Sequence, residues 1–307
     1  MSRIWFSKGL RGMTARRIQT DLRNLGFSAG PPDKFVDGDF GGFTETALAA
    51  LQTQNGLPNH GAVDENTWGL LTEDPLPTLF ERCLGLTAAF EGHGFTLLQG
   101  NFDGAGLTWG LIGFTLKSGE IQSLLRDAEA QQPGTLNRTL GVLTAEWMAI
   151  VQLPMADQLA FGDSLSRPDR KEVVRADWKA AFERLGNEAH VKRLQMDRAH
   201  HKYFVRAAAS AQRLNLVSEL GVALAFDVHV QNGGFKSAAF ELAAQLGDTV
   251  SEAELRLRLA DQVANSALPE WRDDVRKRKQ TIASGVGSVH QHQFRLAAWG
   301  LDDVLAA

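Results

Sequence analysis

The sequence predicts a mainly α-helical protein in two parts, with one short β-rich stretch near its middle. Apolar residues recur at helical spacing across residues 9–72 and again from Ile121 to the end. Residues 95–114 instead form short β-rich runs around a turn at 103–106. Two prolines at 72–77 favour an extended spacer between the parts. We therefore expect an N-terminal domain at 1–74 and a larger domain at 75–307.

Composition and charge narrow the class of protein. The chain has 307 residues and is 44% hydrophobic, which suits two domains with real cores. A net charge of -4 gives no reason to expect nucleic acid or an anionic membrane as a partner. The single cysteine, Cys83, cannot form an intrachain disulfide and lies on an apolar stripe, which predicts a buried core thiol.

The first 74 residues predict a three-helix bundle with one shared core. The first helix ends at Gly26, the second ends at Asn55-Gly56, and Asp64 caps a short third helix. The apolar positions that recur at helical spacing are Ile18, Leu22, Leu25, Ala47, Leu48, Leu51, Trp68 and Leu71.

The loops of this bundle carry a more specific pattern. It runs Asp37-Gly38-Asp39-Phe40-Gly41, Thr44, Leu51-Gln52, Asn55-Gly56-Leu57, Gly61, Val63-Asp64 and Thr67-Trp68. This pattern resembles the peptidoglycan-binding type 1 domain, with Gly42 inserted and Leu51 where Phe is usual. The resemblance implies that the bundle holds an enzyme against cell-wall glycopeptide, with Asp37, Phe40 and Trp68 as wall-binding residues. The alternative is a bundle that has lost binding and packs on its neighbour.

The second domain opens with a helix that ends in a glutamate. Leu79, Cys83, Leu86 and Phe90 form one apolar stripe, and Glu91 follows, just before two glycines that end the helix. Unpaired carbonyls, the negative end of the helix dipole and burial beside Phe90 disfavour a charge there, so we expect a raised pKa for Glu91. A carboxyl that keeps its proton is suited to act as a general acid.

The stretch from Asp103 to Phe114 reads D-G-x-G-x-T-x-G-x-x-G-F. With the preceding helix-ending Glu91, it resembles the catalytic segment of family 46 chitosanases in the lysozyme-like superfamily. The resemblance implies a lysozyme-like α+β domain with a small β-hairpin beside the cleft. Glu91 would be the general acid, Asp103 the general base, and Thr108 the hydroxyl that helps hold the attacking water.

Two features depart from that family. Twelve positions separate the two carboxyls, fewer than expected, and the wall-binding bundle precedes the site. A solvated glutamate at a helix end and an ordinary Asp-Gly turn are the structural alternative, and Asp227 or Glu120 could take the role of Asp103. The separation of the two carboxyls decides the stereochemistry: about 6.5–9.5 Å predicts inversion and about 5–5.5 Å predicts retention.

Further contacts to sugar are predicted at two places. Trp109 is a candidate stacking aromatic. A helix pattern from Leu214 runs into residues 226–234, which resemble the Y-D-x-x-V-Q-H-G element that lines the chitosanase cleft. The resemblance makes Asp227, His229, Gln231 and Asn232 candidate contacts to sugar hydroxyls. The alternative is that they cap a core helix, with His229 as a structural histidine.

The remaining charged clusters predict little chemistry. Five basic residues within 272–279 are most simply a solvated helix face, with one arginine pairing a carboxylate inside the fold. The pairs His200-His201 and His290, His292 lack Cys or carboxylate at ligand spacing, so we expect no metal. No phosphate-binding glycine loop is present in the sequence, and we expect no cofactor.

The sequence therefore predicts a hydrolase of β-1,4 glycosidic bonds in peptidoglycan. Residues 1–19 have no apolar core, so they do not form a secretory signal, and no run is long enough to span a membrane. We expect synthesis in the cytoplasm and action on the wall as a phage lysin or as an injected effector, which would need an immunity protein. The rival functions are a chitosanase and a non-catalytic wall-binding protein.

Overall fold

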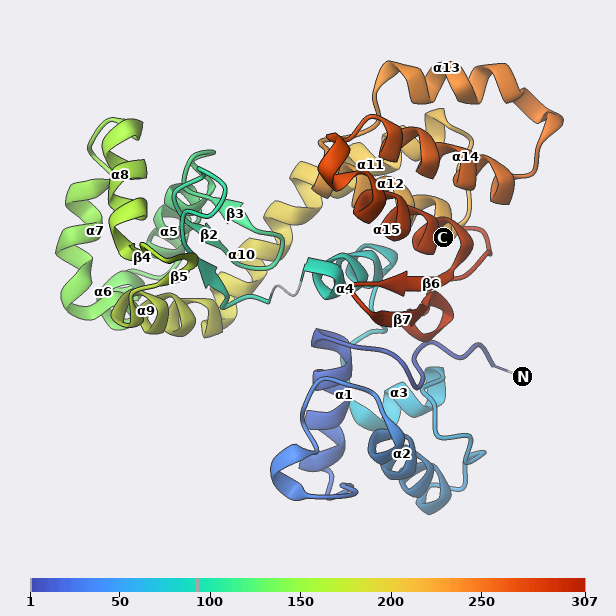
Figure 1. Ribbon diagram of the computed structural model, residues 1–307. Coiled ribbons are helices and arrows are strands. Elements are labelled where there is room, and N and C mark those ends of the chain that lie inside the picture. Colours follow the sequence, from blue (N-terminus) through green and yellow to red (C-terminus); the bar gives the residue numbers. More distant parts are fainter. Residues whose placement is uncertain (1, 92–93, 307) are drawn as a thin grey trace. The chain divides into compact units, whose positions relative to one another are not determined.

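The computed structural model describes residues 2–91 and 94–306 and is built mainly from helices (Figure 1). The chain forms two compact units, one of Met1–Phe90 with Tyr203–Ala307 and the other of Glu91–Lys202. The prediction of a mainly helical fold with a small antiparallel sheet is confirmed. The predicted boundary at residue 74 stays a prediction. None of the helices in the described ranges has the length and apolar composition that a bilayer crossing requires.

The N-terminal part of the first unit is a bundle of three helices. These are α1 (Met13–Asn24), α2 (Gly42–Gln54) and α3 (Glu65–Leu71), with the short η1 (Pro32–Lys34) between the first two. Ile18, Leu48 and Trp68, one from each helix, are buried. Asp64 begins α3, because its Oδ1 accepts the backbone N–H of Thr67 at 2.8 Å. This confirms the predicted cap.

Two buried glutamines fix the loops of this bundle. The Gln19 side chain donates to Asp37 Oδ1 at 2.8 Å and accepts the backbone N–H of Gly38 at 2.7 Å. Gln52 donates to the carbonyl of Ala62 at 2.8 Å and accepts the N–H of Gly61 at 2.9 Å. Each side chain thereby satisfies backbone groups that no regular element pairs.

The rest of the first unit packs around α12 (Glu219–Asn232), whose residues 219–228 are all buried. A helix that is buried on all sides is the centre of a core. The helices α11 (Val205–Arg213), α14 (Glu252–Asn265) and α15 (Arg272–Ser284) pack on it, and α4 (Leu79–Glu91) contacts it through Thr87. The unit also contains α13 (Ser237–Leu246), η4 (Gly247–Thr249), η5 (Pro269–Trp271) and η6 (Leu296–Trp299).

A β-hairpin follows α15 and was not predicted. Its strands are β6 (Val286–Val289) and β7 (His292–Arg295), and a two-residue turn joins them. Both turn residues, His290 and Gln291, have positive φ, of 48° and 68°. Such turns favour Asn-Gly or Asp-Gly, so the pair His290-Gln291 does not signal a hairpin turn in the sequence.

The segment before α1 connects the bundle to the C-terminal helices within the same unit. The buried carboxylate of Glu219 accepts hydrogen bonds from Arg3 and, at 2.9 Å, from Arg82 Nη1 of α4. The two guanidinium carbons lie 4.1 and 4.8 Å from the ring centroid of Trp5. Arg3 and Arg82 also both donate to the carbonyl of Gly300. The bundle is therefore packed against α4 and α12, and the linker is not its only connection to them.

The second unit combines helices with two small antiparallel sheets. The helices are α5 (Glu120–Gln131), α6 (Thr135–Leu140), η2 (Gly141–Leu143), α7 (Thr144–Ile150), α8 (Met155–Leu165), α9 (Ala176–Asn187) and α10 (Ala189–Ala199), followed by the π-helical turn η3 (His200–Phe204). The strands are β1 (Leu98–Gln99), β2 (Thr108–Trp109), β3 (Phe114–Thr115), β4 (Ser166–Arg167) and β5 (Arg170–Val174).

The predicted hairpin is present but short. Gln99 of β1 pairs with Thr108 of β2, and Trp109 of β2 pairs in turn with Phe114 of β3. Gly110 and Gly113, both with positive φ, turn the chain between β2 and β3 and end the run that the sequence pattern read as one strand. The result is a three-stranded sheet whose first turn carries Asp103.

Candidate active site

Asp103 lies in the loop between β1 and β2, and its side chain is exposed. Its Oδ1 accepts the backbone N–H of Ala105 at 3.0 Å, which makes a tight local turn. The carbonyl oxygen of the Asn101 side chain accepts the N–H of Gly106 at 2.9 Å and closes the loop from residue 101 to residue 106. The predicted base is thus an exposed carboxylate on a loop, and the side chains of Asp103 and Asn101 within that loop stabilise its conformation.

Thr108 and Trp109 follow in β2. Thr108 is buried, and its hydroxyl oxygen has no hydrogen-bond partner within the described structure. A buried hydroxyl without a partner is costly, so a water or a ligand group is the expected partner. Trp109 has no exposed surface and packs edge-to-face on Phe182, with ring centroids 5.2 Å apart. Its contacts make it a core residue of the second unit and leave no ring face for a sugar.

Glu91 is the last residue of α4, as the sequence pattern predicts. Its side chain, together with residues 92–93, lies outside the described part of the structure. The neighbouring Phe90 is buried, with its ring centroid 4.7 Å from that of Phe294 and 5.0 Å from the Arg278 guanidinium carbon. These contacts fix the helical turn that ends at Glu91.

Asp227 is completely buried in the first unit and bound to two cations. Its carboxylate accepts hydrogen bonds from Arg278 Nη2 at 2.7 Å, from Lys279 Nζ, and from the Thr87 hydroxyl at 3.0 Å. Burial alone raises the pKa of Asp227, but the charges of Arg278 and Lys279 outweigh it and hold the pKa well below its usual value. The contacts of Asp227 are those of an internal anion that joins α4, α12 and α15, with no surface left for a sugar.

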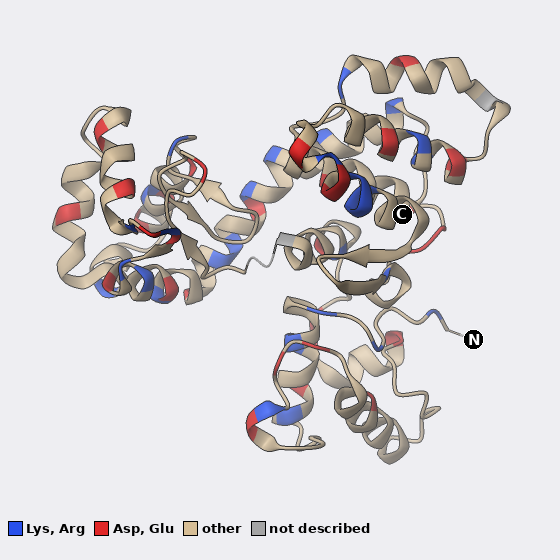
Figure 2. Ribbon diagram, viewed as in Figure 1, with Lys and Arg blue, Asp and Glu red and all other residues tan. Residues whose placement is uncertain are grey.

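The basic residues of α15 divide between surface and interior. Figure 2 shows acidic residues in the first turn of this helix, followed by basic ones. Arg276 remains near the surface and binds Asp261 at 3.2 Å. Arg278 and Lys279 are buried against Asp227, which corrects the expectation of a solvated face with a single internal arginine.

The other predicted sugar contacts at the end of α12 have protein partners or partial burial. Gln231 Oε1 accepts from Lys279 Nζ at 2.7 Å. His229 Nε2 lies 2.9 Å from the Ser210 hydroxyl, and burial, together with Arg206 and Lys236, lowers the pKa of His229. Asn232 lines a small pocket between the end of α12 and α14.

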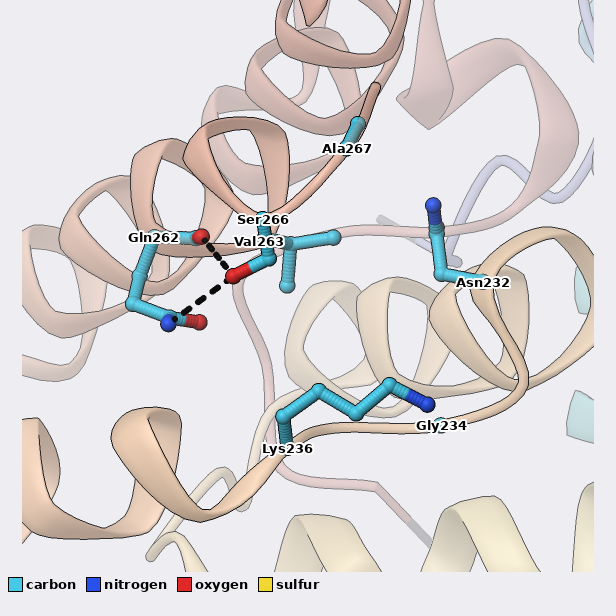
Figure 3. Close-up of a pocket in the computed structure, with 7 residues that line it drawn as sticks. All are labelled: Asn232, Gly234, Lys236, Gln262, Val263, Ser266 and Ala267. Atoms are coloured by element: carbon cyan, nitrogen blue, oxygen red, sulfur yellow. Dashed lines mark hydrogen bonds between the residues drawn. The ribbon is translucent and has the colours of Figure 1, made fainter.

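Figure 3 shows that pocket, with Asn232 and Lys236 across from Gln262 and Ser266. The Ser266 hydroxyl already binds the Gln262 side chain at 3.2 Å. The side-chain oxygens of Asn232 and Gln262 are buried and have no partner in the described ranges, so they are not presented to the open part of the pocket.

Glu120, the alternative partner for Glu91, lies at the start of α5 in a salt-bridge cluster. It binds Arg198 at 2.9 Å and also Lys202. Burial raises the pKa of Glu120, but the hydrogen bonds from Lys202 and Arg198 outweigh it and lower the pKa below its usual value. A carboxylate bound to two cations is a poor proton acceptor, which favours Asp103 for that role.

The predicted wall-binding residues belong to the frame of the N-terminal bundle. Phe40 has no exposed surface, and Trp68 is buried against Phe6 with its Nε1 donating to the carbonyl of Asp74 at 2.8 Å. Asp37 is exposed, and its Oδ1 also accepts the N–H of Asp39 at 2.8 Å. No group of three or more potential metal-ligand side chains occurs among the residues that the structure describes.

Comparison with models of known protein families finds a match within the three-helix bundle. Residues 11–71 match the family model described as "Putative peptidoglycan binding domain". The matched segment spans α1 to α3. No curated protein matches the chain in a sequence comparison.

Comparison with solved structures finds similar chains among chitosanases. A chitosanase from Bacillus subtilis MY002 is 18% identical, with a TM-score of 0.46 over 66% of this chain and 85% of that chain. A GH46 chitosanase from Gynuella sunshinyii in complex with chitotetraose is 14% identical, with a TM-score of 0.46 over 69% of this chain and 88% of that chain.

Several residues that shape the site were not singled out from the sequence. Asn101 closes the Asp103 loop, and the buried Gln195 accepts the N–H of Leu111 at 3.0 Å and donates to the carbonyl of Phe95 at 3.0 Å. In the N-terminal bundle, Gln19 and Gln52 likewise bind the backbone of loops. Only Gln52 carried a signal, through its place in the family pattern.

Proposed function

We propose that the protein is a peptidoglycan hydrolase that cleaves β-1,4 glycosidic bonds of the glycan strand as a muramidase. Glu91 protonates the departing sugar oxygen, Asp103 removes a proton from the attacking water, and Thr108 helps to hold that water. Two carboxyl groups in opposed roles are what such hydrolysis needs.

The observation that carries the proposal is that one short hairpin contains both Asp103 and the Thr108 hydroxyl. Asp103 is exposed and held in place, whereas Thr108 Oγ1 is buried with no partner in the described structure. An exposed carboxylate and an unsatisfied hydroxyl on the same hairpin suit a site that binds and deprotonates water. The unbroken D-G-x-G-x-T-x-G-x-x-G-F pattern supports the same roles.

The choice of peptidoglycan as the substrate is supported by the N-terminal part of the chain. The match of residues 11–71 to the peptidoglycan-binding model suits a protein that works on the cell wall. Arg3, which precedes the bundle, and Arg82 of α4 both bind Glu219, so the wall-binding function would be fixed to α4 and not left on a free tether. The protein would therefore reach its substrate at the wall, outside the cytoplasm.

Mass spectrometry of fragments released from purified peptidoglycan tests the proposal. The wild type is expected to release soluble muropeptides with reducing-end N-acetylmuramic acid. Glu91→Gln and Asp103→Asn should each lower the rate by a factor of about 10²–10⁴, the usual contribution of a general acid or base. Circular dichroism and thermal unfolding of the same variants check that they remain folded.

Other products would change the conclusion in defined ways. Reducing-end N-acetylglucosamine would keep the hydrolase and change the bond that it cuts. Chitosan fragments without any release from peptidoglycan would favour the chitosanase function, to which residues 103–114 bear their resemblance. Binding to peptidoglycan with no new reducing ends on either polymer would mean that the protein is a non-catalytic wall binder.

A further inference from the structure

The Asp103 loop is closed by a neutral side chain that the proposed mechanism does not use. Asn101 Oδ1 accepts the N–H of Gly106 at 2.9 Å, so the first and last residues of the loop are joined across Asp103. Asp103 itself contributes the inner bond, to the N–H of Ala105 at 3.0 Å. Residues 101–106 lie between β1 and β2. These two side-chain bonds close the loop, and backbone bonds from Phe102 N–H to the carbonyl of Gly100 at 2.9 Å and from Lys117 N–H to the carbonyl of Ala105 at 3.1 Å add to them.

The same asparagine fastens the loop to α8. Its Nδ2 donates to Asp163 Oδ1 at 2.9 Å, and its backbone N–H donates to the Ser166 hydroxyl at 2.8 Å. The buried Ser166 hydroxyl in turn donates to the carbonyl of Gly162 at 2.9 Å. Asn101 thus has three hydrogen bonds, one within the loop and two to the end of α8 and the start of β4.

Glycines bring the backbones of these segments into contact. A Cβ atom placed on Gly162 would lie 2.9 Å from the Gly106 carbonyl carbon and 3.0 Å from its Cα. A Cβ atom on Gly100 would lie 2.3 Å from the carbonyl oxygen of Lys171 in β5. No side chain fits between the loop and its supports, so the loop has little room to shift as a body.

A fixed loop matters because the Asp103 side chain is exposed. A general base must come within about 2.6–3.2 Å of the group that it deprotonates. A displacement of about 1 Å can cost about 100-fold in rate. An exposed carboxylate has no packing of its own to hold it, so its position depends on the loop.

We propose that Asn101 is a positioning residue for Asp103: its carboxamide closes the loop on itself and ties it to α8, so that the carboxylate meets the attacking water in one place. This inference rests on the proposed function of Asp103 as the general base. Asp163 has a supporting role, because it accepts the bond that orients the carboxamide.

Steady-state kinetics on glycan strands solubilised from purified peptidoglycan tests this inference. Asn101→Ala is expected to lower kcat by about 10- to 100-fold with KM within about twofold of the wild type, because the substrate contacts remain while the base is displaced. A role in folding alone would leave kcat per folded molecule unchanged. Activity is therefore normalised to the folded fraction, measured by thermal unfolding of each variant.

A matched pair at Asp163 makes the test independent of how well the Asn101 variant folds. Asp163→Asn keeps an oxygen that can accept from Asn101 Nδ2, whereas Asp163→Ala removes it. We expect the asparagine variant to keep kcat within about twofold and the alanine variant to lose about three- to tenfold. Equal kcat for this pair would overturn the inference, as would an Asn101→Ala variant with wild-type kcat.

The Asp103→Asn variant separates this inference from the function on which it rests. If Asp103→Asn is inactive while the Asn101 and Asp163 variants have wild-type kcat, the base is confirmed and the positioning role is wrong. If Asp103→Asn keeps wild-type activity, the proposed base is wrong, and the positioning inference is overturned with it.

Discussion

Two aspartates of this protein lie in segments with equally suggestive motifs, yet the structure holds them in opposite ways. Asp227 is fully buried and binds Arg278 and Lys279. Asp103 is exposed and is held by backbone amides and by neighbouring neutral side chains. A carboxylate bound by two buried cations contributes to the fold, whereas an exposed carboxylate remains accessible to water and to a ligand.

The largest effect is expected at the buried aspartate. Asp227→Ala removes the anion that two buried cations share, and breaking a buried ion pair in this way costs about 3–5 kcal/mol. Urea unfolding of the variant against the wild type measures the loss. A loss below about 1 kcal/mol would mean that Asp227 is not essential to the core and would reopen a role in the site.

The packing that supports Asp103 can be disturbed without touching a charge. Gly162→Ala puts a methyl group within 3.1 Å of three backbone atoms of Gly106, so either α8 or the loop must move. Overpacking of this kind costs about 1–3 kcal/mol, and activity should fall with it. Gly85→Ala in α4 is the control, because its Cβ would meet only the Thr14 hydroxyl, at 3.8 Å. Similar stability of the two variants would show that the loop has room to move.

Asp64 shows the effect of burial without two cationic partners. Its carboxylate is buried like that of Asp227, but its hydrogen-bond donors are mainly neutral groups. Burial raises the pKa of Asp64, but bonds from the Thr67 hydroxyl and N–H and from Ser2 lower it to about 2, below the ordinary 3.8. A lowered pKa adds stability that is complete above pH 3.8 and is lost as the pH falls toward about 2. Asp64→Ala should cost about 0.5–2 kcal/mol at neutral pH, as for a helix cap.

Acid unfolding of the full chain measures the contribution of Asp64 to stability. The wild type should lose more stability than Asp64→Ala between pH 3.8 and about 2. Parallel curves for the two proteins over that range would show that the cap does not lower the pKa of Asp64.

The smallest effect on stability is expected at the exposed aspartate. Asp103→Asn keeps an oxygen for the N–H of Ala105, so the free energy of unfolding should change by no more than about 0.5 kcal/mol. Thermal unfolding beside the activity assay gives both quantities for one variant. A large loss of stability would make Asp103 a structural residue like Asp227 and remove the contrast between them.

The elements that the sequence predicted correctly are those with strong local signals. The stripe that contains Cys83 and Phe90 predicted α4 and its end at Glu91, and Cys83 is buried as expected, with a pKa that burial raises. Asp64 was predicted as a cap because capping depends on neighbours in the chain. The β6–β7 hairpin was missed because His290 and Gln291 are unusual residues for its turn.

The surroundings of the predicted site residues were harder to predict, because their contacts are with residues distant in the sequence. Asp227 meets Thr87 of α4 and Arg278 of α15, and only the folded chain brings these residues together. The sequence made Trp109 a candidate for stacking on a sugar. It contained no signal that Phe182, 73 positions later in the chain, would cover the Trp109 ring. Local patterns identified the loop of Asp103, whereas the partners that hold it, such as Asp163, depend on tertiary packing.

Under the proposed function, the docking of the N-terminal part through Arg3, Trp5, Arg82 and Glu219 would determine how binding and cleavage are coupled. A binding domain on a flexible tether lets its enzyme sample a sphere of substrate at an effective concentration set by tether length. A docked domain replaces that sphere with one fixed offset from α4. Under the proposed function, each binding event would then present a limited set of bonds, and the enzyme would have to release the wall before it cuts elsewhere. Removing residues 1–74 would also take Arg3 from the Glu219 carboxylate and leave it only Arg82 as a cationic partner, so the remainder of the chain would lose stability.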